Sequence, residues 1–267
     1  MGLSRLSSLS CLVLFGFAVT EQSTQAASTV LNSEISVSYA GLPVGTLKHS
    51  YTVSQRDYAI RGSMKSNPLL QMLTGSSADY ASAGRIRGNR LVPLQQSVSY
   101  QTRKRNGAIS LSFQSGNVET ASISPKRKLR RDAVPLTAEH RVGVLDPVSA
   151  LVVTVDRGQI GDGQRICNRT VPVFDGRVRY NLRMSYHSSQ RAATKGFTGQ
   201  VHTCSVRYQP VAGHRPNRAN VKRLVANRSI RVSLARIGDT TSYGLFGFSA
   251  KIRGGTAIGR AERFALR

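Results

Sequence analysis

Side chains able to act as nucleophiles are present, but their spacing matches no catalytic motif. Ser249 follows Gly247, yet the residue two places after it is Lys251 and not the glycine of a nucleophile elbow. The chain contains neither a Ser-x-x-Lys pair nor a His-Glu-x-x-His helix motif. We therefore predict that the protein is not an enzyme and has no catalytic residue, with an envelope hydrolase assembled from distant residues as the less favoured alternative.

Histidines and carboxylates are interpreted as structural. His140, His202 and His214 are scattered, without the paired spacing that a metal site requires. His202 can share a strand face with Cys204, where a lone histidine is usually packed or hydrogen-bonded. Asp146 precedes Pro147 at the start of a predicted helical turn, which favours an N-cap over a catalytic acid. No metal and no cofactor are predicted.

The cysteines predict a structural disulfide. Cys11 lies in a predicted signal segment, which leaves Cys167 and Cys204 as an even pair in an oxidising compartment. A disulfide between them would close a loop of about 38 residues, worth about 3–4 kcal/mol in the chain-entropy model. Two unpaired buried thiols are the alternative.

The sequence is rich in cationic side chains. The net charge is +25, and 30 of the 38 basic residues are Arg. The planar guanidinium pairs well with phosphate and carboxylate groups. The densest basic stretch, 124–135, reads as an exposed loop, and a second covers 212–228. The candidate anion-binding residues are Lys126, Arg127, Lys128, Arg130 and Arg131. An even basic bias over the whole surface is the alternative.

The first residues predict export. Arg5 precedes an apolar run from Leu9 to Val19, which has the length of a signal-peptide core and is too short to span a bilayer. Thr24 and Ala26 give a small-x-small cleavage pattern, so residues 1–26 are predicted to be a signal peptide and 27–267 a single all-β domain. The alternatives are an N-terminal membrane anchor and, less favoured, a lipoprotein. Export to the periplasm argues against nucleic acid as a partner.

The elements that would position these groups are strands. Apolar and polar residues alternate over 35–39, 109–113, 178–186 and 230–234, as in antiparallel strands with one face in water. Turn signals such as Asn106-Gly107 and Asp175-Gly176 separate the runs. Roughly ten to fourteen strands are expected. Two short helices are predicted over 69–73 and 148–152, each following an Asn-Pro or Asp-Pro start.

Four segments carry a resemblance to a known family. They are Tyr39 to Gly45, Val144 to Leu151, Cys167 with the following Val173 to Leu182, and Cys204 to His214. Together they resemble the domain of unknown function 3108 family of exported bacterial proteins, in its alphaproteobacterial form, over about residues 33–266. The resemblance implies export and a large curled antiparallel sheet forming an open or partly closed β-barrel. It implies no established activity, so no catalytic residue is carried over.

Two non-enzymatic functions follow from this fold. An open curled sheet offers a concave apolar surface, as in the lipoprotein carriers of the periplasm, an analogy at fold level only. The first hypothesis is a binding protein for a hydrophobic or amphipathic envelope component. Its candidate ligand-facing residues are Tyr39, Phe113, Tyr180, Met184 and Tyr186. These residues could instead fill a closed core. The second hypothesis is a structural or interaction protein whose basic loops dock on anionic membrane, lipopolysaccharide or an acidic partner. The oligomeric state cannot be read from the sequence.

Overall fold

The computed structural model describes residues 27–267 except 69, 72–74 and 127–129. Among these, fourteen strands form one antiparallel sheet. The alternation predicted antiparallel strands, and the family resemblance implied a single large sheet. The strands are β1 Thr29–Tyr39, β2 Leu42–Val53, β3 Asp57–Ser66, β4 Ser77–Arg87, β5 Arg90–Gln101, β6 Asn106–Gln114, β7 Asn117–Ser124, β8 Val152–Thr154, β9 Arg169–Phe174, β10 Arg179–Thr194, β11 Phe197–Ala212, β12 Arg231–Arg236, β13 Ser242–Ile252 and β14 Gly255–Leu266. The helical turns are η1 Ala138–Arg141, η2 Ser149–Leu151 and η3 Arg157–Gln159, and the α-helices with complete bounds are α2 Gly163–Cys167 and α3 Ala219–Ala226.

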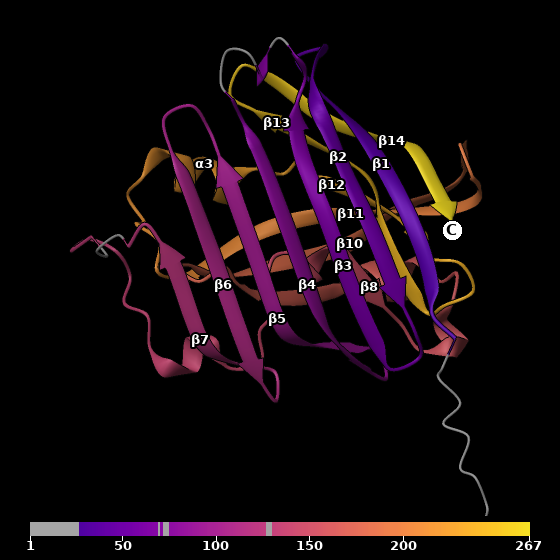
Figure 1. Cartoon of the computed structure of the whole chain (residues 1–267), viewed down its shortest axis with the longest axis horizontal. Helices are drawn as coiled ribbons and strands as arrows, with labels where there is room; N and C mark the ends of the chain where they lie inside the picture. The colour runs from indigo at the N-terminus through magenta and orange to yellow at the C-terminus, as the bar shows by residue number, and fades with distance from the viewer. Residues whose placement is uncertain (1–26, 69, 72–74, 127–129) are drawn as a thin grey trace, which may run out of the picture.

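The order of the strands makes the sheet one curled ribbon. It runs β7-β6-β5-β4-β3-β2-β1-β14-β13-β12-β11-β10-β9, with β8 added beside β13. Figure 1 shows β1–β7 as a front layer with β10 and β11 crossing behind it. Register shifts in several strand pairs, such as that at Glu34/Ile35, insert β-bulges that bend the ribbon. The ribbon ends at β7 and β9 without pairing them, so the predicted barrel is an open one.

The connection between β7 and β9 covers the seam of this open barrel. Leu145 forms a parallel bridge to Val173, with Leu145 N donating to Pro172 O at 2.8 Å. Val144 is buried beside Phe113 and Phe174, in a cluster that joins the two edges. The free edge of β9 is thereby occupied by the chain's own backbone, which removes a site for edge-to-edge association.

The core consists of three clusters of buried side chains. The first lies between the front layer and the strands behind it and contains Leu31, Tyr51, Val53, Tyr58, Ile60, Ile86, Val148, Val152, Val201, Ala235, Ile237 and Phe264. The second surrounds the two cysteines and contains Val153, Val155, Ile166, Cys167, Val171, Val173, Met184, Cys204, Val206, Leu234 and Tyr243. The third contains Leu111, Phe113, Val118, Val144 and Phe174.

Several local predictions need correction. The helix predicted over 148–152 is present only as the shorter 3-10 helix η2, Ser149–Leu151, because β8 begins at Val152. Asn106-Gly107 is not a turn but the start of β6, and the reversal lies at Thr102–Arg105, where the two backbones exchange hydrogen bonds. Neither α2 nor α3 was predicted. Much of the helix predicted over 69–73 lies outside the described residues, although Asn67 accepts a hydrogen bond from Leu70 N, as an N-cap would.

Candidate anion-binding surface

The predicted ligand-facing residues are not gathered on one concave surface. Phe113 belongs to the third core cluster and Met184 to the second, with Tyr180 and Tyr186 packed against the second. Tyr39 lies at the far end of β1, where its hydroxyl donates to Arg253 O. The structure thus places four of these side chains in or against two core clusters, whereas Tyr39 lies outside the clusters.

A fully buried polar cluster stabilises the connection between β7 and β9, which covers the seam. Asp146 and Ser149 are fully buried, beside Ser82 and Tyr58 on the front layer. One carboxylate oxygen of Asp146 accepts from Val148 N at 2.9 Å and Ser149 N at 2.8 Å. The other accepts from the hydroxyls of Ser82 at 2.9 Å and Ser149 at 2.5 Å. Asp146 therefore caps the turn, as predicted, and also binds it to β4. Burial raises the pKa of this carboxyl, and the hydrogen bonds oppose that rise.

A second buried polar pair joins β2 and β4. His49 is 4% exposed, and its Nε2 lies 2.8 Å from the hydroxyl of Tyr80. Burial lowers the pKa of His49 to about 4, so the imidazole is neutral at physiological pH. This pair was missed by the sequence reasoning, because neither residue lies in a motif.

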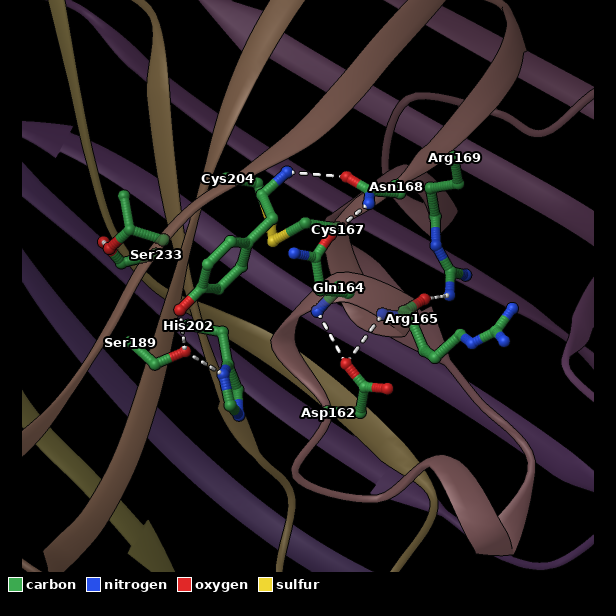
Figure 2. The surroundings of a disulfide bond; sticks show 12 residues. Asp162, Gln164, Arg165, Cys167, Asn168, Arg169, Ser189, His202, Cys204 and Ser233 are labelled. Atoms are coloured by element: carbon green, nitrogen blue, oxygen red, sulfur yellow. Dashed lines mark hydrogen bonds between the residues drawn. A yellow bond between two sulfur atoms is a disulfide. The ribbon is translucent and has the colours of Figure 1, made fainter.

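One serine and one histidine meet on β10 and β11. Ser189 Oγ lies 2.7 Å from His202 Nδ1 (Figure 2). Asp162 is the nearby carboxylate, but its Oδ1 accepts from Gln164 N and Arg165 N at the start of α2. A serine hydrolase needs a serine bonded to a histidine that is in turn bonded to a carboxylate. These three groups do not form such a triad, because Asp162 bonds to backbone N–H groups instead. Among the described residues, no group of three or more His, Cys, Asp or Glu side chains is placed to hold a metal ion.

The two cysteines form the disulfide that the sequence predicted. Cys167, the last residue of α2, is bonded to Cys204 in the middle of β11, and both are fully buried (Figure 2). The bond joins α2 to β11 within the second core cluster. No helix in the described part of the chain is both long and apolar enough to cross a bilayer.

The two predicted basic stretches lie side by side. Gly213 N donates to Val134 O at 2.8 Å, and Arg215 Nε pairs with Asp132 at 2.7 Å. The hydrogen bond from Arg215 lowers the pKa of Asp132. Of the candidate anion-binding residues, Lys126, Arg130 and Arg131 are exposed, whereas Arg127 and Lys128 lie outside the described residues.

A tighter group of arginines lies on β10–β12. Arg183 on β10 is directly opposite Arg207 on β11, and the next pair along the same face is Ser185 and Ser205. Ser205 is in turn opposite Arg231 on β12. Because directly paired residues project from the same face of a sheet, the three arginines share one face. We call Arg183, Arg207 and Arg231 the arginine row.

The arginine row has little compensating charge. Between Asp175 and Asp239 the sequence has no acidic residue, whereas its basic residues there are Arg177, Arg179, Arg183, Arg191, Lys195, Arg207, Arg215, Arg218, Lys222, Arg223, Arg228, Arg231 and Arg236. In the described part of the chain two ion pairs form, and neither involves the row. Arg183 and Arg207 are exposed, and Arg231 donates to Arg228 O at 3.0 Å. Like charges directly opposite each other destabilise a sheet, so this arrangement favours a bound anion.

Comparisons with known proteins identify a family and no activity. Residues 34–241 match the family described as "Protein of unknown function (DUF3108)". Among solved structures, the chain is similar to a beta-barrel-like protein of domain of unknown function DUF1849 from Brucella abortus. The two are 12% identical over 91% of this chain and 98% of that chain, with a TM-score of 0.48. No curated protein matches the chain significantly.

Proposed function

The chain belongs to the DUF3108 family of proteins of unknown function, and from its surface we propose that it is a non-enzymatic envelope protein that binds a phosphate-bearing, amphipathic envelope component. The arginine row is the observation that carries this proposal. Three guanidinium groups on one sheet face, without an acidic neighbour in the surrounding sequence, supply the charge and the hydrogen-bond donors that a phosphate group requires.

Export to the periplasm is part of the proposal. A buried disulfide is expected of proteins that fold in an oxidising compartment. The predicted signal peptide, 1–26, lies outside the described residues. In the periplasm the abundant phosphate-bearing partners are phospholipid headgroups and lipopolysaccharide, and nucleic acid is not among them.

The packed interior supports binding by the outer surface. Four of the five candidate ligand-facing residues pack in or against core clusters, so an acyl chain would have to displace core side chains to reach them. The hydrophobic part of an amphipathic partner is therefore accommodated outside the barrel, while its headgroup meets the arginines. This combines the binding and docking hypotheses in one surface.

The test compares two double variants of equal charge. We expect Arg183→Gln/Arg207→Gln to weaken binding to phosphatidylglycerol-containing vesicles about tenfold or more, since each cation near an anionic surface contributes about 1 kcal/mol. The control is Arg61→Gln/Arg90→Gln, two exposed arginines on the front layer. It should lose less affinity, although it removes the same charge. Equal losses in a vesicle sedimentation assay would show that net charge, and not the arginine row, sets the affinity.

A further inference from the structure

Four exposed apolar side chains lie on α3, at the start of β2 and at the end of β13, toward the end of the sheet at which β12 begins. Helix α3 has no buried residue, and Leu224 and Val225 are 39% and 38% exposed. Ile252, in the last position of β13, is 52% exposed, and Leu42, at the start of β2, is 70% exposed. We call Leu42, Leu224, Val225 and Ile252 the apolar tip. The sequence reasoning treated none of these four as functional.

Hydrogen bonds hold α3 against the turn between β13 and β14. Asn227, the residue after α3, donates from Nδ2 to Lys251 O at 2.8 Å. Ser229 Oγ accepts from Lys251 N, also at 2.8 Å. The segment that follows α3 therefore adjoins the end of β13, where Ile252 lies.

The turn between β1 and β2 adjoins the same region. Ala40 N donates to Thr256 O at 3.0 Å, and the Tyr39 hydroxyl donates to Arg253 O. Figure 1 shows the β1–β2 and β13–β14 turns at the same end of the molecule, the upper end in that view. Leu42 thus extends the apolar tip along this end.

The charged residues close in sequence to the apolar tip are all positive. Lys222, Arg223, Arg228, Lys251 and Arg253 flank its side chains, and residues 39–45, 218–231 and 249–256 include no acidic residue. The region continues into the arginine row, because Val206 N donates to Ile230 O at 3.0 Å, next to Arg207 and Arg231.

Exposed apolar side chains next to cations favour one class of partner over others. A soluble anionic polymer would be bound by the cations alone and would leave the apolar side chains in water. A bilayer with anionic headgroups satisfies both, because apolar side chains enter the boundary of the acyl chains while Lys and Arg reach the phosphates. The charge complementarity therefore points to a membrane.

We propose that the apolar tip inserts into the interfacial region of an anionic phospholipid bilayer and orients the arginine row against its headgroups. This inference rests on the proposed function and deepens it, since it names a bilayer as the source of the phosphate. The protein approaches the membrane with the end that carries α3 and the β13–β14 turn.

The absence of tryptophan from the sequence makes a clean test available. Leu224→Trp and Ile252→Trp each introduce a single reporter, on two different segments of the tip. Leu94→Trp on β5 is the control, because Leu94 is 43% exposed and lies outside the tip. With phosphatidylglycerol vesicles, we expect the emission of both tip variants to shift to shorter wavelength and to become severalfold less sensitive to an aqueous quencher. The control should not change.

The outcomes separate the two proposals. If Arg183→Gln/Arg207→Gln weakens sedimentation selectively but neither tip reporter shifts, the arginine row binds phosphate and the insertion of the tip is wrong. A shift as large for Leu94→Trp as for the tip variants would also overturn the inference. If none of the proteins sediments with anionic vesicles at low salt, both proposals fail together.

Discussion

The carboxylate of Asp146 is the clearest case in which hydrogen bonding decides the role of a residue. Both of its oxygens are occupied, one by two backbone N–H groups and the other by two hydroxyls. A general acid or base needs a free position toward a substrate, and this carboxylate is fully buried. Asp146 therefore stabilises the segment that covers the seam between β7 and β9.

Two substitutions at Asp146 test this role. Alanine leaves the backbone N–H groups and hydroxyls without their acceptor, so we expect Asp146→Ala to lower the free energy of unfolding by about 2–4 kcal/mol. Asp146→Asn keeps an acceptor for the two N–H groups and should cost less. Thermal or urea unfolding, measured for both variants and for the wild type, checks the order. Equal losses for alanine and asparagine would contradict the capping role.

The pH dependence of the same pair follows from the raised pKa of Asp146. A carboxyl whose pKa is higher in the folded state contributes stability below its unfolded pKa, near 3.8, and that contribution is lost as the pH rises through the folded pKa. Asparagine has no such loss. The stability of Asp146→Asn relative to wild type should therefore increase over the pH range that begins near 4. A constant difference over this range would show that the pKa is not raised.

At the scale of elements, the arginine row depends on one β-bulge. At the β10–β11 turn, Thr194 pairs with Phe197, and with uninterrupted pairing from there Arg183 would lie opposite Tyr208. The register shift between Tyr186 and Ser188 brings Arg207 opposite it instead. Alternation predicted that Arg183 faces water, but the position of a bulge is set by packing across the sheet, so the partner of Arg183 could not be predicted.

The strands were predicted more completely than the helices. The predicted strands 35–39 and 109–113 lie within β1 and β6, and those over 178–186 and 230–234 lie within β10 and β12 except for their first residues, because each has one buried and one solvated face. Asp175-Gly176 was a correct turn signal, with Gly176 at φ 92°. Helix α3 was missed because it has no buried residue and its basic side chains resemble those of a loop.

The disulfide is expected to contribute to the stability of the fold. It attaches α2 to β11 and closes a loop worth about 3–4 kcal/mol, so we expect reductant to lower the melting temperature of the wild type by several degrees. The double variant Cys167→Ser/Cys204→Ser should melt below the oxidised wild type, and reductant should not change its melting temperature. Each protein is denatured and refolded with or without reductant, and its melting temperature is then measured by thermal unfolding. A wild type whose melting is the same in both would show that the disulfide adds no stability.

At the scale of the whole molecule, the sheet is open but its interior is filled. Val148 and Val152 pack in the first core cluster from the segment that links β7 to β9. Period-two patterns show that one face of each strand is buried, but they do not show what buries it. The filled interior therefore could not be predicted from the strands alone, and it directs attention to the cationic outer surface.

Sedimentation with phosphatidylglycerol vesicles over a range of salt concentrations shows whether this surface binds an anionic envelope component. Charge–charge attraction between exposed groups is screened over about 10 Å at 0.1 M salt and about 3 Å at 1 M. We predict strong retention at low salt, a steep decrease as salt rises, and little retention on phosphatidylcholine vesicles at any salt. Equal retention at low and high salt, or on both lipids, would contradict the account.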